Sequence, residues 1–493
     1  MRRSIVGRGG GVNLLTTRRG VRLLTLAACL GAPVGLWAQA PSAGPVAGTQ
    51  PFTFEQALRY ALEHYPAVRA ALEEITASNA AISVAKAAYL PRLDSLWQTN
   101  RGTANNIFGQ VLPQAVIPAM SGPVLPSASG GSVWGSAAGA LFSWEPFDFG
   151  LRHATVAGAD AAVARARATE ALTQLDVQIA VGTAFLNVVG AQRAVAALQA
   201  DVDRRDLLSR AVHTLVDNQL RPGAEASRSD AERAAAQTRL IQAQQSVTLA
   251  QIALARVLGV TPGPVAIETT TLIDRLPAEV PVDASAAGPT THPLTQARKT
   301  AVDVARAQED ILSRTDWPRV YFQSSVFARG SGANANGQLD GGFSGLGLDR
   351  ANWAAGLQVI FPNAFDFTSL RARKAAAAAA ARIETARYDE AILTVTSEQQ
   401  AAAAMVQAAR AVAANTPVQL AAARQSEAQA GARYQAGLAS IVEVADAQSL
   451  LAQAEVQDQL ARIDVWRALL AQSAAHGALS PLVSLLNPSA GAR

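Results

Sequence analysis

Few side chains in this sequence are placed for catalysis. The five histidines are scattered, and none lies in a His-Glu-x-x-His motif, the spacing that binds zinc from one helix face. Neither a Gly-x-Ser-x-Gly nucleophile motif nor a glycine-rich phosphate loop occurs. The single cysteine, Cys29, lies near the N-terminus, so a disulfide or a cysteine-based metal site is not expected. We therefore expect neither an enzyme nor a bound cofactor or metal.

Two carboxylates near the C-terminal end form the most informative polar cluster. Glu443 and Asp446 are three residues apart in a helical pattern, so they share a helix face. Ser440 precedes Glu443 by three residues, the spacing of a capping box, in which a hydroxyl and a carboxylate bond the free N–H groups at a helix start. Spacing alone is equally consistent with a solvated helix face.

The elements that must position these residues occur in two similar halves. Pro66 is followed 25 positions later by Pro91-Arg92, and Pro293 is followed 25 positions later by Pro318-Arg319. An alanine-rich helical pattern precedes each Pro-Arg pair, and an alternating stretch follows it. The two segments therefore read as copies of one unit.

Two further sequence pairs recur in the same order. Phe-Asp-Phe occurs at 147–149 and at 365–367, each time after an alternating stretch and before a long helical pattern. The pattern Ser-x-x-Asp/Glu-x-x-x-Ala begins at Ser227 and again at Ser440. Repetition that keeps its order predicts an internal structural duplication.

Each half contains a very long helical pattern, at residues 151–218 and 367–435. At ~1.5 Å per residue each helix would be about 100 Å long. Patterns this long indicate coiled-coil or extended helix packing. Their contacts are dominated by alanine, unbroken at 375–381, which supplies little apolar area per residue. A single chain would be poorly stable in this form, so we expect self-assembly.

The alternating stretches have the pattern of strands in a barrel wall. In residues 351–361, Trp353 and Leu357 belong to a bulky set that alternates with small or polar residues, as in a wall with one face toward lipid. Trp134 and Trp144 share a face and would lie about 34 Å apart along a strand. A tilt of ~45° reduces this to about the height of an outer-membrane apolar band, with a tryptophan at each interface.

The connections between the strands favour this interpretation over a half-buried strand in a soluble sandwich, which alternation alone does not exclude. Residues 102–131 and 329–349 are long Gly-, Ser-, Asn- and Pro-rich segments, as expected on the external side of a barrel. After the N-terminal region, no run approaches the ~18 consecutive apolar residues of a membrane helix. If the protein lies in a membrane, strands must hold it there.

The N-terminal segment, residues 1–38, is predicted to be an export signal. Arginines up to Arg22 precede an apolar run with small residues near its end. An alternative is processing as a lipoprotein, since Leu26 to Cys29 resemble a lipidation motif that would leave Cys29 acylated. The formal net charge of +4 arises from the six arginines of this segment, so nucleic acid is not expected as a partner.

The whole layout resembles the TolC-like outer-membrane efflux family. The resemblance runs from "FTFEQALRYALEHYPAVRAALEE", through both Phe-Asp-Phe junctions, to "RYQAGLASIVEVADAQSLLAQAEVQ". It implies a mixed α and β membrane protein: a homotrimer whose chains each give four strands to one twelve-stranded β-barrel, continued by a long α-helical coiled-coil barrel. It also implies a location in the outer membrane of a Gram-negative-type bacterium, extending into the periplasm, with a periplasmic adaptor and an inner-membrane pump as partners.

The resemblance also assigns roles to single residues. Gly223 and Gly437 match the turn glycines where adaptor tips bind. Glu443 and Asp446 match two carboxylates that ring the pore constriction, and Tyr434 matches a tyrosine that holds the aperture shut. The sequence departs from the family in its first turn, where Pro222 and one extra residue stand, and at Ala439, where some members carry an arginine of the closing network.

We expect four regions along the chain: the signal peptide, a first repeat at 52–275, a second repeat at 290–480, and a tail at 481–493. The predicted function is an outer-membrane exit duct of an efflux or type I secretion system, gated at the periplasmic helix tips. The alternative is a periplasmic adaptor, which also uses long helical hairpins. An adaptor would lack two pairs of alternating strands with aromatic ends.

Overall fold

The computed structural model describes residues 51–103, 114–117, 130–260, 263–268, 288–334, 336, 338–362 and 366–486. These residues all belong to one compact unit, which begins at Pro45. The predicted signal peptide, with Cys29, lies outside the described residues.

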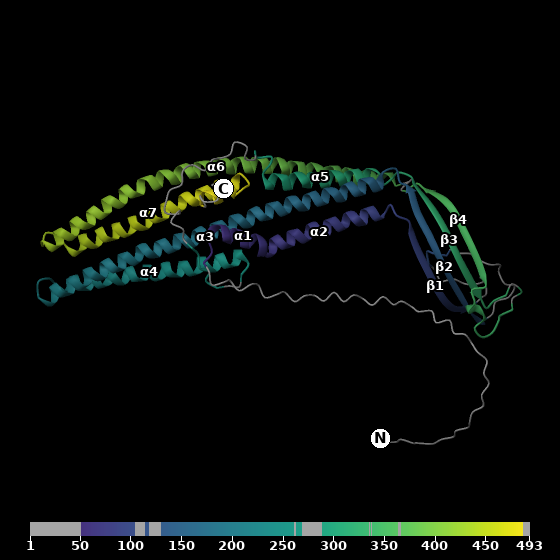
Figure 1. The fold of residues 1–493 in the computed structure, drawn as a ribbon, viewed down its shortest axis with the longest axis horizontal. Helices are drawn as coiled ribbons and strands as arrows, with labels where there is room; N and C mark the ends of the chain where they lie inside the picture. Colours follow the sequence, from purple (N-terminus) through teal and green to yellow (C-terminus); the bar gives the residue numbers. More distant parts are fainter. Residues whose placement is uncertain are drawn as a thin grey trace, which may run out of the picture. The chain divides into compact units, whose positions relative to one another are not determined.

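Among the described elements, one order recurs in both halves: a helix, two strands, a long helix and a shorter helix (Figure 1). The first half consists of α1 (Phe54–His64), α2 (Pro66–Ala87), β1 (Arg92–Thr103), β2 (Ser132–Phe147), α3 (Leu151–Asp217) and α4 (Gly223–Leu258). The second half consists of α5 (Pro293–Ser313), β3 (Arg319–Ser331), the short 3-10 helix η2 (Ser344–Leu346), β4 (Arg350–Ile360), α6 (Phe367–Gln435), α7 (Ile441–Ala475) and α8 (Ser480–Leu486).

The repeated prolines mark helix starts and strand starts. Pro66 and Pro293 are the first residues of α2 and α5, where a missing N–H costs no hydrogen bond. The start of α5 is also capped, because Nδ1 of His292 accepts a hydrogen bond from Leu294 N at 3.1 Å. The residues that follow the second proline of each pair, Arg92 and Arg319, are the first residues of β1 and β3. The 25-residue spacing between the two prolines of each pair therefore corresponds to one helix, α2 or α5, and the short link to the next strand.

The two long helices have the predicted length. α3 contains 67 residues and α6 contains 69. They differ in their proline content: α6 continues through Pro417, whereas α3 contains no proline. Next to this proline, buried Thr416 donates a hydrogen bond to Asp458 of α7 at 3.0 Å.

The first Phe-Asp-Phe motif makes a tight strand-to-helix turn. Phe149 and Gly150 both have positive φ angles, 52° and 93°. Asp148 stabilises the turn, since its carboxylate accepts hydrogen bonds from Gly150 N at 3.1 Å and from Arg152 Nε at 2.9 Å. In the second copy, Asp366 precedes α6 without a side-chain cap. Asp366 therefore does not repeat the cap that Asp148 makes.

The four strands form one antiparallel sheet in the order β1-β2-β3-β4. Its register places most of the exposed bulky apolar side chains on one face. Trp97, Val326, Trp353 and Leu357 lie on this face and are each more than 60% exposed. We call this the apolar face. Trp134 and Trp144 also point to it, as predicted from their even spacing.

The opposite face of the sheet is mainly polar, and we call it the polar face. Its side chains include Asp94, Gln98, Asn100, Arg319, Gln323, Arg329, Asn352 and Gln358. One described part of the β1–β2 connection, residues 114–117, packs on this face rather than extending beyond the strands, which corrects the expectation for that part of 102–131.

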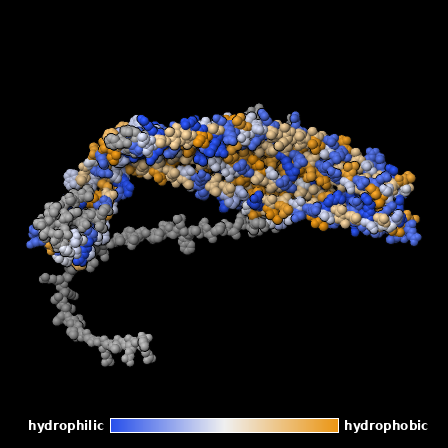
Figure 2. All heavy atoms as spheres, turned by 180° about the vertical axis from the view of Figure 1, so that it is seen from behind, coloured by the Kyte–Doolittle hydropathy of each residue, from blue (hydrophilic) through white to orange (hydrophobic). Residues whose placement is uncertain are grey.

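The largest apolar core lies among the helices. It joins α1, α3, α4, α7 and α8, with the rings of Phe54 and Phe185 in edge-on contact at 5.4 Å. By length and composition α3 could cross a membrane, and it is alone in this among the helices of the described residues. Its apolar stretch, however, contributes Val181, Phe185 and Val189 to the core. Hydrophobic side chains are also scattered over the helical surface in Figure 2, as expected for a chain that packs against further copies.

Substitution of Phe185 tests this core. Phe185 is 1% exposed, so Phe185→Ala removes a buried ring and should destabilise the protein by about 3–5 kcal/mol. Phe343, which is 72% exposed, supplies the matched control Phe343→Ala. The temperature at which the folded assembly loses its heat-modifiable gel mobility should fall clearly for the first variant and little for the second. Equal shifts would show that this cluster is not the main core.

Candidate functional site

The two helical hairpins end in turns that use different left-handed residues. In the α6–α7 turn, Gly437 has φ 75°, a conformation that glycine adopts without a Cβ clash. In the α3–α4 turn the left-handed residue is Gln219, with φ 58°, while Gly223 is the first residue of α4. A Cβ on either glycine would meet no atom of the described structure within 4 Å. The backbone at both tips is therefore open to close approach.

The predicted capping box at the start of α7 is half formed. Ser440 Oγ accepts a hydrogen bond from Glu443 N at 3.4 Å. The Glu443 carboxylate does not complete the box; it pairs with Arg433 of α6 at 3.4 Å. Arg433 also donates to the carbonyl of Leu438 at 3.3 Å. The Arg433 guanidinium therefore takes the carboxylate that would otherwise bond the backbone at the start of α7. Its second bond, to the Leu438 carbonyl, holds the turn to the end of α6.

Glu443 and Asp446 lie on one exposed stripe of α7. The same stripe continues through Leu450, Gln453 and Gln457, and the residues between them are largely buried. The Glu443 side chain is 48% exposed and that of its partner Arg433 is 59% exposed, so their ion pair contributes only about 0–1 kcal/mol. Both carboxylates are therefore accessible to mobile cations. The described residues contain no group of three or more His, Cys, Asp or Glu side chains placed to hold a metal ion.

Tyr434 connects the two hairpins. It lies near the end of α6 and is 5% exposed. Its hydroxyl donates a hydrogen bond to Glu225 Oε2 of α4 at 2.7 Å. Burial, together with Glu225, raises the pKa of Tyr434 to about 12. The phenol therefore stays protonated at physiological pH and can donate to the carboxylate.

Arg221, in the α3–α4 turn, holds the same tyrosine from a second side. Its guanidinium lies over the Tyr434 ring, 4.6 Å from the centroid, and donates to the Tyr434 carbonyl at 3.0 Å. It also lies 3.8 Å from the Glu225 carboxylate. A cation over an aromatic face contributes about 0.5–2 kcal/mol, more when it is removed from water. We call Arg221, Glu225 and Tyr434 the tip latch.

An apolar cluster surrounds the latch. It contains Val212 of α3, Ala226 of α4 and Ile441 and Val444 of α7, and the side chain of Ala439 is 9% exposed within it. Ala439 stands where some members of the resembled family carry an arginine of the closing network. The cation of the latch comes instead from Arg221, on the opposite hairpin.

A second polar connection joins the hairpins farther from the tips. Arg204 of α3 makes two hydrogen bonds to Glu455 of α7, at 2.7 and 3.3 Å. Its neighbour Arg205, 2% exposed, bonds Asp201, Glu232 of α4 and Ser449 of α7 at 2.9–3.0 Å. Breaking such a buried network is costly because it leaves charges without partners. α3, α4 and α7 are thus fixed together at this level.

Sequence analysis found Tyr434 but missed both of its partners. Arg221 and Glu225 are four residues apart, a spacing that favours an ion pair on one helical turn. That signal was available in "LRPGAE". Nothing in the sequence connects it to Tyr434, which lies 209 residues from Glu225.

Comparison with protein families decides the identity. The sequence model of one family, described as "Outer membrane efflux protein", matches residues 57–260 and 291–478, most of the chain. The chain belongs to the outer membrane efflux protein family. Both hairpins and all four strands of this efflux protein lie within the matched residues or between them. Comparison with curated protein sequences gave no match.

Solved structures share the fold at low sequence identity. VceC of Vibrio cholerae is 18% identical, with a TM-score of 0.68 over 86% of this chain and 96% of its own. The CmeC channel of Campylobacter jejuni is 12% identical, with a TM-score of 0.69 over 86% of this chain and 85% of its own. The open state of the MtrE channel of Neisseria gonorrhoeae is 20% identical, with a TM-score of 0.66 over 86% of this chain and 89% of its own.

The predicted class of protein is confirmed. The efflux protein is an outer-membrane channel that extends into the periplasm, an exit duct and not an enzyme. Proteins of this family form homotrimers and work with adaptor proteins and inner-membrane pumps. The four described strands and the long helical hairpins match the predicted barrel and its helical continuation. The alternative, a periplasmic adaptor, is not favoured.

The tip latch yields a direct prediction. Tyr434→Phe removes a hydrogen bond to a charged group, about 1.5–3 kcal/mol, and should shift the balance between closed and open tips by about tenfold or more. Single-channel recording in planar bilayers should show a higher open probability. Tyr388→Phe, on the same helix, is the control and should match the wild type. An unchanged Tyr434→Phe channel would contradict the latch.

Proposed function

We propose that the duct is closed at its periplasmic end by the two hairpin tips, with Tyr434 as the closing residue. The observation that carries this is the bond from Tyr434 to Glu225, because it links α6 to α4 and therefore one hairpin to the other. Arg221 strengthens the closed arrangement by contacting both residues. The Arg204–Glu455 connection holds the hairpins together behind the tips, so opening needs only the last turns to separate.

An adaptor opens the tips by binding the open arrangement more tightly than the closed one, since only differential affinity can shift such an equilibrium. Gly223 and Gly437 are proposed to mark its contact surface. Next to them, Leu220 and Leu438 are 68% and 71% exposed, large apolar side chains at the ends of both hairpins. Their exposure fits a partner that presents apolar side chains of its own helical tips.

A photo-crosslinking residue in place of Leu438 tests this contact. In cells it should capture a periplasmic protein with a long helical hairpin, identified by mass spectrometry. The same residue in place of Leu207, which is also exposed but lies on α3 away from the turn, should not. Equal capture at the two positions would show that the hairpin tip is not the docking surface.

The carboxylates Glu443 and Asp446 are proposed to ring the narrowest part of the duct. They are exposed on one stripe of α7, and in a trimer two acids from each of three chains would concentrate cations there. Such a ring slows large anions and binds multivalent cations. The choice of cargo then rests mainly on the inner-membrane pump.

The ring predicts block by multivalent cations. A trivalent cation should reduce the single-channel current of the wild type, and Glu443→Ala/Asp446→Ala should abolish this block. Asp464→Ala removes an exposed carboxylate from the same helix and should leave the block intact. Persisting block in the double variant would refute the assignment.

We also propose that residues 52–275 and 290–480 are two copies of one ancestral unit, followed by a tail at 481–493. The support is the common order of a helix, two strands, a long helix and a shorter helix in each. The first part of the tail is occupied by α8, whose Leu482 and Leu486 pack into the core.

A further inference from the structure

The β1–β2 connection contributes a segment to the interior side of the sheet. Residues 114–117 are described, and the residues on either side of them are not. Ile117 is 2% exposed and packs with Ala137 of β2 and Phe327 of β3, with Val116 and Leu96 at the edge of the same cluster. We call residues 114–117 the inner segment.

The register of the strands identifies the face that this segment covers. Ala137 is paired with Gln98 and Arg329, and Phe327 is paired with Gly139 and Asn352. All of these lie on the polar face. The apolar face, with exposed Trp97 and Trp353, is the side that suits lipid. In a closed barrel the inner segment therefore lies in the lumen.

The inner segment has a defined conformation of its own. Gln114 Oε1 accepts hydrogen bonds from Val116 N and from Ile117 N, the latter at 2.9 Å, and its Nε2 donates to Ile117 O at 2.7 Å. One side chain thereby satisfies both polar groups of the Ile117 backbone. Ile117 can then enter the apolar cluster without leaving a backbone group unpaired, which would cost about 1–3 kcal/mol.

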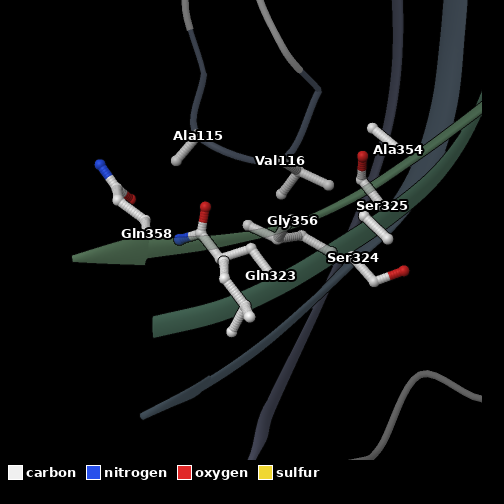
Figure 3. A pocket seen from close by; sticks show the side chains of 11 residues that line it. Ala115, Val116, Gln323, Ser324, Ser325, Ala354, Gly356 and Gln358 are labelled. Atoms are coloured by element: carbon white, nitrogen blue, oxygen red, sulfur yellow. The ribbon is translucent and has the colours of Figure 1, made fainter. Parts of the chain in front are cut away.

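The segment stands above the sheet and leaves a cavity of about 470 Å³ beside it (Figure 3). In this view Ala115 and Val116 face Gln323 and Gln358 across the cavity. Gln323 lies in the middle of β3, and Gln358 lies close to the end of β4 that leads to α6. The inner segment thus reaches well down the strands. Every residue that lines this cavity is uncharged.

We propose that the inner segment forms a second constriction of the duct, inside the barrel. Three copies, one from each chain, narrow the lumen with apolar and amide surface, in series with the acidic tips. The first constriction acts on charge, and the second acts on size: it admits slender cargo of either charge and holds back bulky molecules. It is built from the barrel's own connection and does not depend on how the tips open.

Cysteine labelling at Ala115 tests this inference. Ala115 is exposed, so Ala115→Cys should leave the fold intact, which heat-modifiable gel mobility checks. A bulky polyethylene-glycol maleimide added on the external side should reduce the single-channel current in as many as three steps, one for each chain. Because the label obstructs the lumen itself, the same fractional loss of current should appear in Ala115→Cys/Tyr434→Phe, in which the tips are expected to be open more often.

Two controls make the result specific. Phe343→Cys replaces an exposed ring in the β3–β4 connection that contacts Trp134 at the loop end of β2, outside the lumen, and should be labelled without loss of current. The wild type reports any reaction of Cys29, the only native cysteine. Complete labelling of Ala115→Cys with an unchanged current would overturn the proposal, and so would a cysteine at 115 that the reagent fails to reach.

Discussion

The open edges of the four-stranded sheet are the constraint on which the rest of the structure depends. Within the described residues, β1 and β4 each pair with one neighbour only, while one face of the sheet is apolar and exposed. In a bilayer every backbone polar group must be bonded, so a sheet with free edges is stable there only when it closes into a barrel. Closure with further copies turns the apolar face to lipid and the polar face to a lumen. A barrel closed by several chains follows from these two requirements, in agreement with the homotrimers that this family forms.

The helices in the periplasm also depend on neighbouring copies of the chain. Their surfaces are rich in alanine and bury little apolar area per residue. Stability is instead concentrated in the core around Phe185 and in the polar network at Arg205. Between that network and the ends of the helices, the hairpins are joined by the tip latch and by the small apolar cluster around it. This distribution suits a gate, because the last turns can separate while the rest of the tunnel keeps its packing.

Much of this architecture could be predicted from the sequence. Repeated prolines gave the helix and strand starts, and alternation at residues 351–361 gave the apolar face of β4. Side-chain partners distant in sequence could not be predicted. Tyr434 was found only through a family resemblance, and Arg221 and Glu225 emerged only when the fold placed the α3–α4 turn beside it. Glu443 shows a second limit, since Arg433 competes with the predicted capping box for the same carboxylate.

Residues 114–117 illustrate the third limit. A long Gly-, Ser- and Pro-rich connection suggests an external loop, and composition does not reveal that a short apolar piece of it folds back. The reason is local: Gln114 supplies the hydrogen bonds that the Ile117 backbone needs, and Phe327 supplies an apolar surface. Neither fact is visible until the register of β3 is known.

The central claim is that the two hairpin tips close the duct, and bridging them tests it most directly. In Glu225→Cys/Tyr434→Cys the latch is removed, so the current in planar bilayers should exceed that of the wild type. A short bis-methanethiosulfonate, which forms a disulfide with each of the two cysteines as a methanesulfinate leaves from each end, should return the current to the closed level, and reduction of the two disulfides should restore it. A current that stays the same after the bridge forms would show that the tips do not gate the channel.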